Sequence, residues 1–261
     1  MKLRNAVVAA ALALAAAPVF AGPDTVELTN ISGAWFNPTP IAGVTITNGD
    51  PLSSARWGTP ATASGQSGYD YTAAAGPLDF IVNPPPAAAA QIVGTFNHLN
   101  FPIFPPNLES IQLDVQADVA VDAIGEGTFH FIFDFTHDET PNGGPPGGPF
   151  TGSCPFGGAN GAGINVQGCA DRVTVTGNAL SQVFSVGGVD YTLEVLGFSN
   201  DGGATFTNEF LTTENQQNAA NLYARVSAVN PPTVPEPGSL ALLGLGLLAA
   251  GFMRRKSNGQ R

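Results

Sequence analysis

Positive charge is scarce in this sequence, and most of it lies near the two ends. Nine Lys and Arg residues stand against twenty Asp and Glu residues, which gives a formal net charge of −11. Between the ends only Arg56, Arg172 and Arg225 remain. A domain this acidic repels nucleic acid and anionic membrane surfaces, so we expect neither as its partner.

The common catalytic motifs are missing as well. The three histidines form no HExxH pair, and the chain contains neither a G-x-S-x-G elbow nor a phosphate-binding glycine loop. Asp114, Asp118 and Asp122 share one face of a predicted strand, but successive members are about 13 Å apart, too far for a glycosidase acid pair. We therefore predict a protein that is not an enzyme and has no catalytic residues.

Helix-favouring Lys and Glu are rare, whereas the chain contains 32 glycines and 22 prolines. Low charge combined with frequent turns and β-branched segments is typical of an all-β sandwich or barrel. We predict one domain over residues 22–230, an antiparallel, jelly-roll-like β-sandwich.

The clearest strand covers residues 110–123, where apolar and polar residues alternate. Gly125 and Gly127 mark a turn, and residues 127–139 resume the alternation with four inward phenylalanines, so the two segments predict a central antiparallel hairpin. Further strands are predicted at 33–35, 43–47, 53–58, 172–176, 182–186, 189–198 and 221–229, with hairpin turns at Gly177-Asn178 and Gly187-Gly188 and loops at 83–90 and 140–150.

Cysteine is limited to Cys154 and Cys169. Two nearby cysteines in an oxidising compartment most often pair, and closing a loop of about fifteen residues contributes about 3 kcal/mol in the chain-entropy model. A metal site would need more soft ligands nearby, and a redox pair would usually lie closer together. We predict a disulfide.

Residues 1–21 have the pattern of a signal peptide. Lys2 and Arg4 precede an apolar stretch, and Val19 and Ala21 suit the −3 and −1 positions of cleavage. The pattern predicts export through Sec and removal of the segment by signal peptidase.

The other end, residues 231–261, contains fourteen residues from Leu240 to Met253 without a charged or polar side chain. As a helix this run covers about 21 Å, less than the bilayer core of about 30 Å, so we predict a short transmembrane helix that inserts transiently in the inner membrane. Arg254, Arg255 and Lys256 follow and would orient it with the domain outside. An ordinary C-terminal anchor remains the alternative, with the same topology and no cleavage.

The order of Pro235-Glu236-Pro237, apolar run and basic residues, paired with a signal peptide, resembles the PEP-CTERM sorting signal, a module also labelled the ice-binding protein C-terminal motif. The resemblance implies recognition by an exosortase, a membrane cysteine protease-transpeptidase that cuts at the motif and passes the protein to the cell surface or extracellular matrix. It also implies a Gram-negative host that makes exopolysaccharide and biofilm. We do not expect ice binding, because the chain lacks repeated Thr-x-Thr ladders.

The segment His98-Leu99-Asn100 resembles a family of PEP-CTERM proteins named for a Thr-His-x-Asn (THxN) signature, although Asn97 stands at the threonine position. The function of that family is unknown, so it supplies no catalytic residues. His98 has three candidate roles: bonding backbone groups to fix a loop across the sheet, contacting a ligand, or binding a metal. Asn100 is expected to form an Asx-type turn.

A second polar segment places Asp134, His137, Asp138 and Glu139 within six residues. Carboxylate oxygens suit Ca²⁺, but the order of a calcium loop is missing, and a solvated strand end is the alternative. We expect no cofactor apart from this optional Ca²⁺.

Together these features predict an exported structural or interaction protein of the cell surface or matrix, with exopolysaccharide as a candidate partner. The alternative function is a carbohydrate-binding module with optional Ca²⁺. Its candidate sugar-stacking residues are Trp35, Trp57, Tyr69 and Tyr71, of which Trp35 suits the core equally well.

Overall fold

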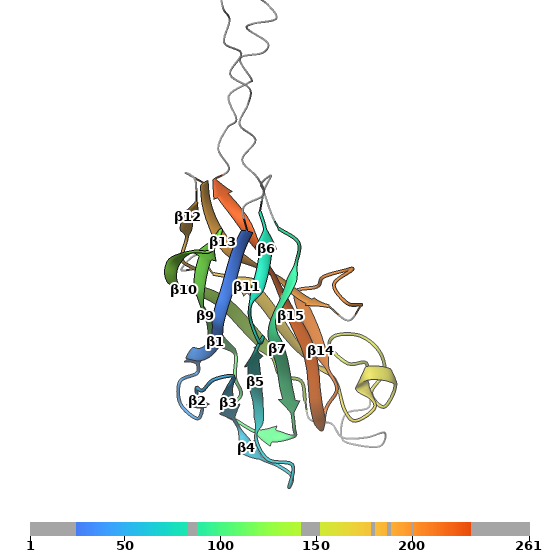
Figure 1. Ribbon diagram of the computed structural model, residues 1–261. Helices are drawn as coiled ribbons and strands as arrows, with labels where there is room; N and C mark the ends of the chain where they lie inside the picture. Colours follow the sequence, from blue (N-terminus) through green and yellow to red (C-terminus); the bar gives the residue numbers. More distant parts are fainter. Residues whose placement is uncertain are drawn as a thin grey trace, which may run out of the picture.

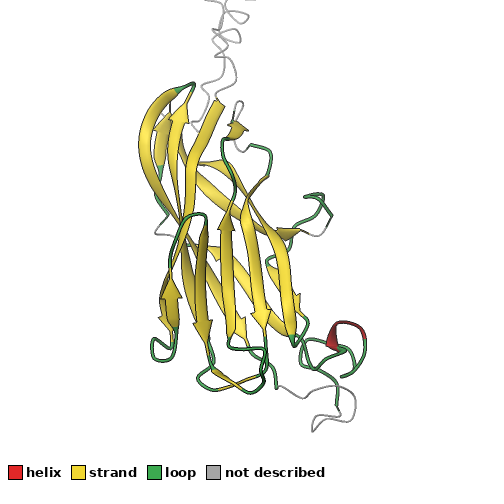
Figure 2. Ribbon diagram, turned by 60° about the horizontal axis from the view of Figure 1, so that its bottom comes forward, coloured by secondary structure: helices red, strands yellow, loops and turns green. Residues whose placement is uncertain are grey.

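A computed structural model describes residues 25–82, 88–141, 152–178, 181–186, 189–199 and 201–230. They form two curled antiparallel sheets packed face to face (Figure 1). Figure 2 shows that strands dominate the described part, whose single helical element is the 3₁₀ turn η1 (Gly163–Asn165). The structure confirms the predicted all-β, jelly-roll-like sandwich.

The first sheet has six strands in the order β14-β11-β10-β9-β1-β6. Their bounds are β1 (Thr25–Thr39), β6 (Leu78–Ile81), β9 (Ser110–Val121), β10 (Ile124–Asp138), β11 (Asp171–Gly177) and β14 (Glu209–Thr212).

The second sheet has seven strands in the order β12-β13-β15-β7-β5-β3-β2. Their bounds are β2 (Thr45–Thr47), β3 (Leu52–Trp57), β5 (Ser67–Ala73), β7 (Gln91–Asn100), β12 (Phe184–Val186), β13 (Val189–Ser199) and β15 (Gln216–Asn230). A short ladder of β4 (Thr59–Pro60) and β8 (Ile103–Phe104) lies beside these sheets.

The predicted central hairpin is confirmed as β9 and β10. Every second residue of β9 is buried, as the alternation required. The turn, however, lies at Asp122 and Ala123, whose φ angles of 47° and 66° are left-handed, and not at the glycines. Gly125 and Gly127 instead lie at a register shift inside the ladder, because the second glycine has a φ of 118° that suits a bulge.

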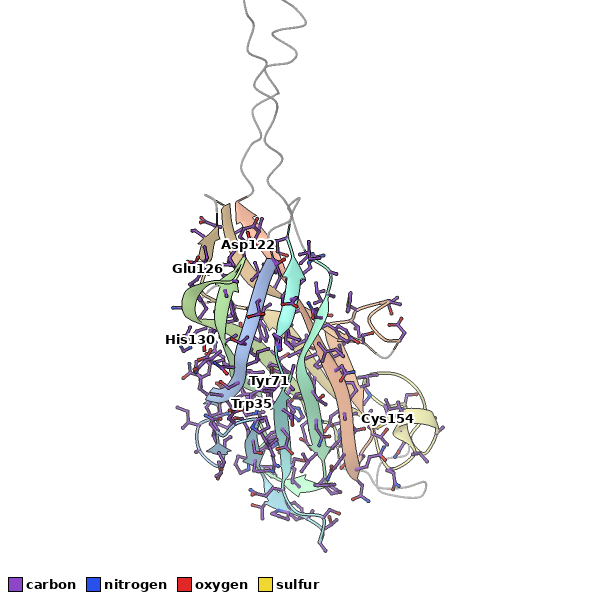
Figure 3. All side chains as sticks on the ribbon, in the orientation of Figure 1. Trp35, Tyr71, Asp122, Glu126, His130 and Cys154 are labelled. Carbon is purple, nitrogen blue, oxygen red and sulfur yellow. A yellow bond between two sulfur atoms is a disulfide. The ribbon has the colours of Figure 1, made fainter. Side chains whose placement is uncertain are left out.

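The four aromatic residues predicted to stack on sugars are core residues, so that prediction was wrong. Trp35, Trp57, Tyr69 and Tyr71 are each at most 1% exposed. Strand alternation points them into the space between the sheets, and Figure 3 shows Trp35 and Tyr71 in the middle of the sandwich. Residues in this position stabilise the fold and cannot receive a sugar ring.

Two further expectations from the sequence were wrong. The segment around His98 is the regular strand β7 and not a loop, and it pairs with both β5 and β15. Gly177-Asn178 does not close a hairpin, because β11 belongs to the first sheet and β12 to the second. The chain crosses from one sheet to the other at this point. The predicted pairing of the segments around residues 187–188 is confirmed, since β12 pairs with β13.

The predicted disulfide is confirmed. Cys154 and Cys169 are bonded, with their Cα atoms 5.2 Å apart. Figure 3 shows Cys154 in a loop at the side of the sandwich, and this loop leads directly into β11. The disulfide thus closes the loop that precedes Asp171.

The described chain begins and ends at the same end of the sandwich, where Thr25 starts β1 and Asn230 ends β15 (Figure 1). The predicted signal peptide (1–21), sorting tail (231–261) and transmembrane helix (240–253) lie outside the described residues. Among the residues that are described, no helix is long and apolar enough to cross a membrane.

Candidate functional site

A group of polar side chains is buried between the two sheets at the end of the sandwich opposite Thr25 and Asn230. Strands of both sheets contribute to it, and we call it the buried polar cluster. Its members are Tyr69 (β5), His98 and Asn100 (β7), His137 (β10), Glu139, Asp171 (β11), Thr212 (β14) and Glu214.

Strand alternation explains why the two histidines point inward. His98 follows the core residue Phe96 by two positions, and His137 follows Phe135 by two. Asp171 likewise lies two positions before the buried Val173. Each polar side chain therefore continues the apolar face of its own strand into the interior.

His98 is fully buried, and one of its ring nitrogens has no partner. Its Nδ1 lies 2.8 Å from Oγ1 of Thr212. That hydroxyl donates to the carbonyl oxygen of Asp171 at 3.4 Å and accepts from Nδ2 of Asn100 at 3.3 Å. Because the hydroxyl has a single proton, Nδ1–H of His98 is the donor in their bond. The lone pair on Nε2 then faces the interior without a hydrogen bond.

These contacts differ from those expected of the His98 segment. The imidazole bonds a threonine side chain and not backbone groups. Asn100 forms no Asx turn: it is a buried strand residue whose amide donates to the carbonyl oxygen of Thr212 at 3.0 Å. Both side chains thus connect β7 of the second sheet to β14 of the first.

His137 is held by a tyrosine from the opposite sheet. Its Nδ1 lies 2.7 Å from the hydroxyl of Tyr69, and its Nε2 lies 3.1 Å from Oε2 of Glu139 and 4.0 Å from Oδ2 of Asp171. Burial, followed by the charge on Asp171, raises the pKa of Tyr69 well above its ordinary value, so the phenol keeps its proton. The phenol donates to Nδ1 in one tautomer of His137 and accepts from Nδ1–H in the other.

Asp171 is also fully buried, and only one of its oxygens is bonded. Oδ1 accepts from the backbone N–H of Thr140 at 2.7 Å, while Oδ2 has no hydrogen-bond partner. Burial raises the pKa of this carboxyl to about 7, and the charge on Glu139 acts in the same direction. Keeping this carboxylate charged costs free energy because the interior withholds water from it.

Glu214 adds a third carboxyl group. The residue is 1% exposed, and neither of its carboxyl oxygens has a hydrogen-bond partner. Burial raises its pKa to about 9, with further contributions from the charges on Asp171 and Glu139. Three acidic groups therefore share one interior region.

No arginine in the described part of the chain neutralises this region. Each arginine of the described residues is paired elsewhere: Arg56 with Asp70, Arg172 with Asp138 and Glu209, and Arg225 with Glu194. Buried carboxyl groups are normally paired, bonded or bound to a metal. Two imidazoles and three carboxyl groups are side chains of the kinds that can hold a cation.

Aromatic packing fixes the orientation of the two imidazoles. The ring of Trp57 stacks on His98 with 6.0 Å between centroids and meets His137 edge-on at 5.2 Å. The two histidine rings are themselves nearly perpendicular, 5.0 Å apart. Such packing limits the rotation of both rings and holds their nitrogens in place.

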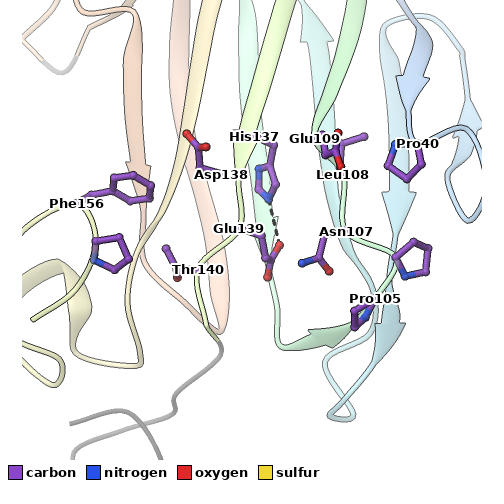
Figure 4. A pocket seen from close by; sticks show the side chains of 12 residues that line it. Pro40, Pro105, Asn107, Leu108, Glu109, His137, Asp138, Glu139, Thr140 and Phe156 are labelled. Carbon is purple, nitrogen blue, oxygen red and sulfur yellow. Dashed lines mark hydrogen bonds and ion pairs between the residues drawn. The ribbon is translucent and has the colours of Figure 1, made fainter. Parts of the chain in front are cut away.

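A cleft of about 600 Å³ opens onto one side of the cluster. Figure 4 shows His137, on β10, and Glu139, in the segment that follows, at the wall of this cleft; their side chains are 0% and 6% exposed. Thr140 also lines the cleft, on the side where Phe156 lies. The cleft thus lies next to the cluster, with Glu139 and His137 at the boundary between them. Its other lining residues are Pro40, Pro105, Pro106, Asn107, Leu108, Glu109, Asp138 and Pro155.

The acids proposed from the sequence as Ca²⁺ ligands do not act together. Asp134 accepts hydrogen bonds from Gln112 and Asn178, and Asp138 pairs with Arg172. Only Glu139 of this set reaches the buried polar cluster.

Asp171, Thr212 and Glu214 were not predicted from the sequence as site residues, and Tyr69 was predicted only as a sugar-stacking residue and not as a partner of His137. For Asp171 a usable signal existed, because a carboxylate in phase with Val173 and Val175 on the apolar face of a strand has to be buried.

Comparison with protein families gives a match in the C-terminal tail, residues 231–261. A profile described as the PEP-CTERM protein-sorting motif matches residues 233–256. Residues 233–256 are a PEP-CTERM protein-sorting motif. The match includes the predicted sorting residues Pro235, Glu236, Pro237, Arg254, Arg255 and Lys256.

The PEP-CTERM motif indicates an exported protein that is anchored transiently in the membrane, with Sec export and recognition by an exosortase. The match covers the tail and not the sandwich. No curated protein sequence matches the chain.

Proposed function

We propose that this chain is an exosortase-processed protein of the cell surface or extracellular matrix, made by a Gram-negative bacterium that produces exopolysaccharide. Its role there is structural or interactive and not enzymatic. The observation that carries the proposal is the PEP-CTERM motif at residues 233–256, which follows directly on a folded β-sandwich.

The placement of the chain ends supports this role. Asn230 lies at the end of the sandwich opposite the cleft, and the sorting motif begins three residues later. A domain tethered through this end presents its cleft away from the membrane. The disulfide is consistent with an oxidising compartment outside the cytoplasm.

The ectodomain is assigned to the THxN group within this proposal. His98 and Asn100 support it, since both are fully buried and both bond to Thr212. In this proposal the two signature side chains have a structural role, because they join the two sheets at the cleft end of the sandwich.

The experiment that tests the proposal is fractionation of the native host with and without its exosortase. The full chain and a variant with Pro235→Ala, Glu236→Ala and Pro237→Ala are followed by immunoblot. We expect the wild type in the surface or matrix fraction, and both the variant and the exosortase-deficient strain to retain the chain in the inner membrane. Surface delivery without the exosortase would contradict the proposal.

A carbohydrate-binding module remains the second candidate function, with the cleft and not the core aromatics as its site. Phe156, Glu109 and Asp138 line this cleft and offer one ring and two carboxyl groups to a sugar. Affinity for the polysaccharide of the host, reduced at least ~10-fold by Phe156→Ala, is the expected result. Absence of binding to that polysaccharide rules this function out.

A further inference from the structure

From the buried polar cluster we infer that the sandwich holds one structural divalent cation of the zinc class, bound by His98, His137 and Asp171. One ligand atom from each of these side chains lies within 4.8 Å of the others. The three residues come from β7, β10 and β11 and so join the two sheets. This site lies apart from the sorting motif and does not depend on the proposed function.

The strongest evidence is the pair of ligand atoms without a partner. Nε2 of His98 and Oδ2 of Asp171 are buried, and neither makes a hydrogen bond. Buried polar atoms are bonded in the great majority of native proteins, so each such atom calls for an explanation. A cation bound between these two atoms would satisfy both.

Their other atoms are already held in the way that metal ligands require. Nδ1 of His98 donates to Thr212, which leaves the lone pair on Nε2 available, and Oδ1 of Asp171 is fixed by the N–H of Thr140. Histidine ligands usually bond through their second nitrogen to an outer partner that orients the ring. Here Thr212 has that position for His98. Tyr69 has it for His137 in the tautomer whose Nδ1–H donates to the phenol oxygen, and Nε2 would then exchange its contact with Glu139 for the ion.

The geometry suits a small ion. Ligand atoms at about 2.0–2.2 Å from a tetrahedral zinc ion lie about 3.4 Å from one another. The observed 4.0 Å between Nε2 of His137 and Oδ2 of Asp171 is close to this value, and rotations of the side chains can close the difference. Glu214, with two unpartnered oxygens in the same region, is the candidate for the fourth ligand.

Ligand chemistry argues against calcium. Ca²⁺ takes six to eight oxygen ligands, whereas imidazole nitrogen is a preferred ligand of Zn²⁺ and other first-row transition metals. Two imidazole ligands therefore favour an ion of the zinc class over Ca²⁺. The site is also buried, and structural zinc sites are closed in the same way.

A cation would also resolve the charge imbalance of the cluster. Asp171, Glu139 and Glu214 lie together, and the described arginines are paired elsewhere, so a divalent ion would supply the positive charge that lets these acids ionise. His137 and Glu139 line the cleft, so an ion would enter from this side once the Glu139 side chain moves.

The test uses the full chain purified from its host with the disulfide intact. The protein is stripped with EDTA, dialysed and titrated with Zn²⁺ by calorimetry, with Ca²⁺ as the comparison ion. We expect one Zn²⁺ per chain, a higher melting temperature on binding, and no comparable effect of Ca²⁺. X-ray absorption at the zinc edge should show two imidazole ligands.

Four variants locate the site. His98→Gln and Asp171→Asn should weaken zinc affinity by more than the ~10–100-fold that loss of an outer-shell partner costs. His130→Gln and Asp134→Asn make the same chemical changes on the outer surface of β10 and should leave the affinity unchanged.

Zinc binding that survives in His98→Gln, or binding of Ca²⁺ in its place, would overturn the inference. So would a wild type that retains no stoichiometric zinc. Should the buried variants fail to fold, the absorption spectrum of the wild-type complex decides: two imidazoles support the site, and one or none contradicts it.

Discussion

The hydroxyl of Tyr69 and the imidazole of His137 form a hydrogen bond of 2.7 Å across the interior of the sandwich. Tyr69 belongs to β5 of the second sheet and His137 to β10 of the first, so the bond joins the sheets directly. Both residues are buried. The bond links the aromatic core of the molecule to its buried polar cluster.

Removing the Tyr69 hydroxyl tests how much that bond contributes to the free energy of unfolding. Tyr69→Phe keeps the ring but leaves Nδ1 of His137 without a partner, which should lower the free energy of unfolding by about 1–3 kcal/mol. Urea titration of the full chain measures the change. Tyr223→Phe, at a tyrosine of β15 packed against Phe206, is the matched control and should stay within about 0.5 kcal/mol of the wild type.

The ring of Tyr71 occupies the space beside Gly33 and Gly94, so neither position can take a larger residue without a clash. A Cβ atom at Gly94 would lie 2.4 Å from the ring, and one at Gly33 would lie 2.3 Å from it. Gly94→Ala should therefore destabilise the domain by about 1–3 kcal/mol through overpacking. Gly125→Ala, with nothing within 4 Å of its new methyl group, should be nearly neutral in the same unfolding assay. Equal effects of the two changes would contradict this account of the core.

The disulfide is expected to stabilise the segment that leads into Asp171. Cys169 contributes its carbonyl oxygen to a hydrogen bond from Oγ1 of Thr140, beside the buried carboxylate. Replacing both Cys154 and Cys169 by Ser should lower the free energy of unfolding by about 3 kcal/mol. Chemical denaturation of the oxidised wild type and of the double variant gives the difference, and identical midpoints would show that the loop is held by other contacts.

Glu194 lies on the outer face of the second sheet, and its contribution to the free energy of unfolding should depend on pH. A hydrogen bond from Arg225, followed by one from Ser227, lowers its pKa below the ordinary value. A depressed pKa stabilises the folded state above the unfolded pKa, and this contribution disappears as the pH falls through the folded pKa. Because the pair is largely exposed, the effect should stay below about 1 kcal/mol.

Glu194→Gln should thus be slightly less stable than the wild type near neutral pH. The two proteins should converge as the pH falls through the ordinary pKa of glutamate, about 4.3, and then through the lower pKa of the folded protein. Melting temperatures across this range measure the convergence. A constant gap between the two curves would mean that packing, and not charge, sets the effect.

The general fold could be predicted because most of its strands show a strict alternation. The alternation of apolar and polar residues over 110–121 predicts a half-buried strand, and the observed burial has the same alternation. The strand β7 was missed because its inward residues include His98 and Asn100, whose burial depends on partners in β14. Local pattern does not contain that information.

The candidate site could be predicted only in fragments. His98, Glu139 and Cys169 were noticed as separate features, yet His98 and Thr212 are 114 positions apart in the chain. Their meeting depends on the order of strands in two sheets, which periodicity does not determine. The hairpin turn was misplaced for a local reason: Asp122 and Ala123 adopt left-handed φ angles that glycine usually takes.

The most direct test of the proposed processing is the intact mass of the protein, recovered from each fraction of its native host and measured under denaturing conditions. We predict a species that begins at Gly22 and ends near Pro237, found in the surface or matrix fraction. A mature species that still carries residues 240–261 would contradict cleavage at the sorting motif and make the tail a permanent anchor.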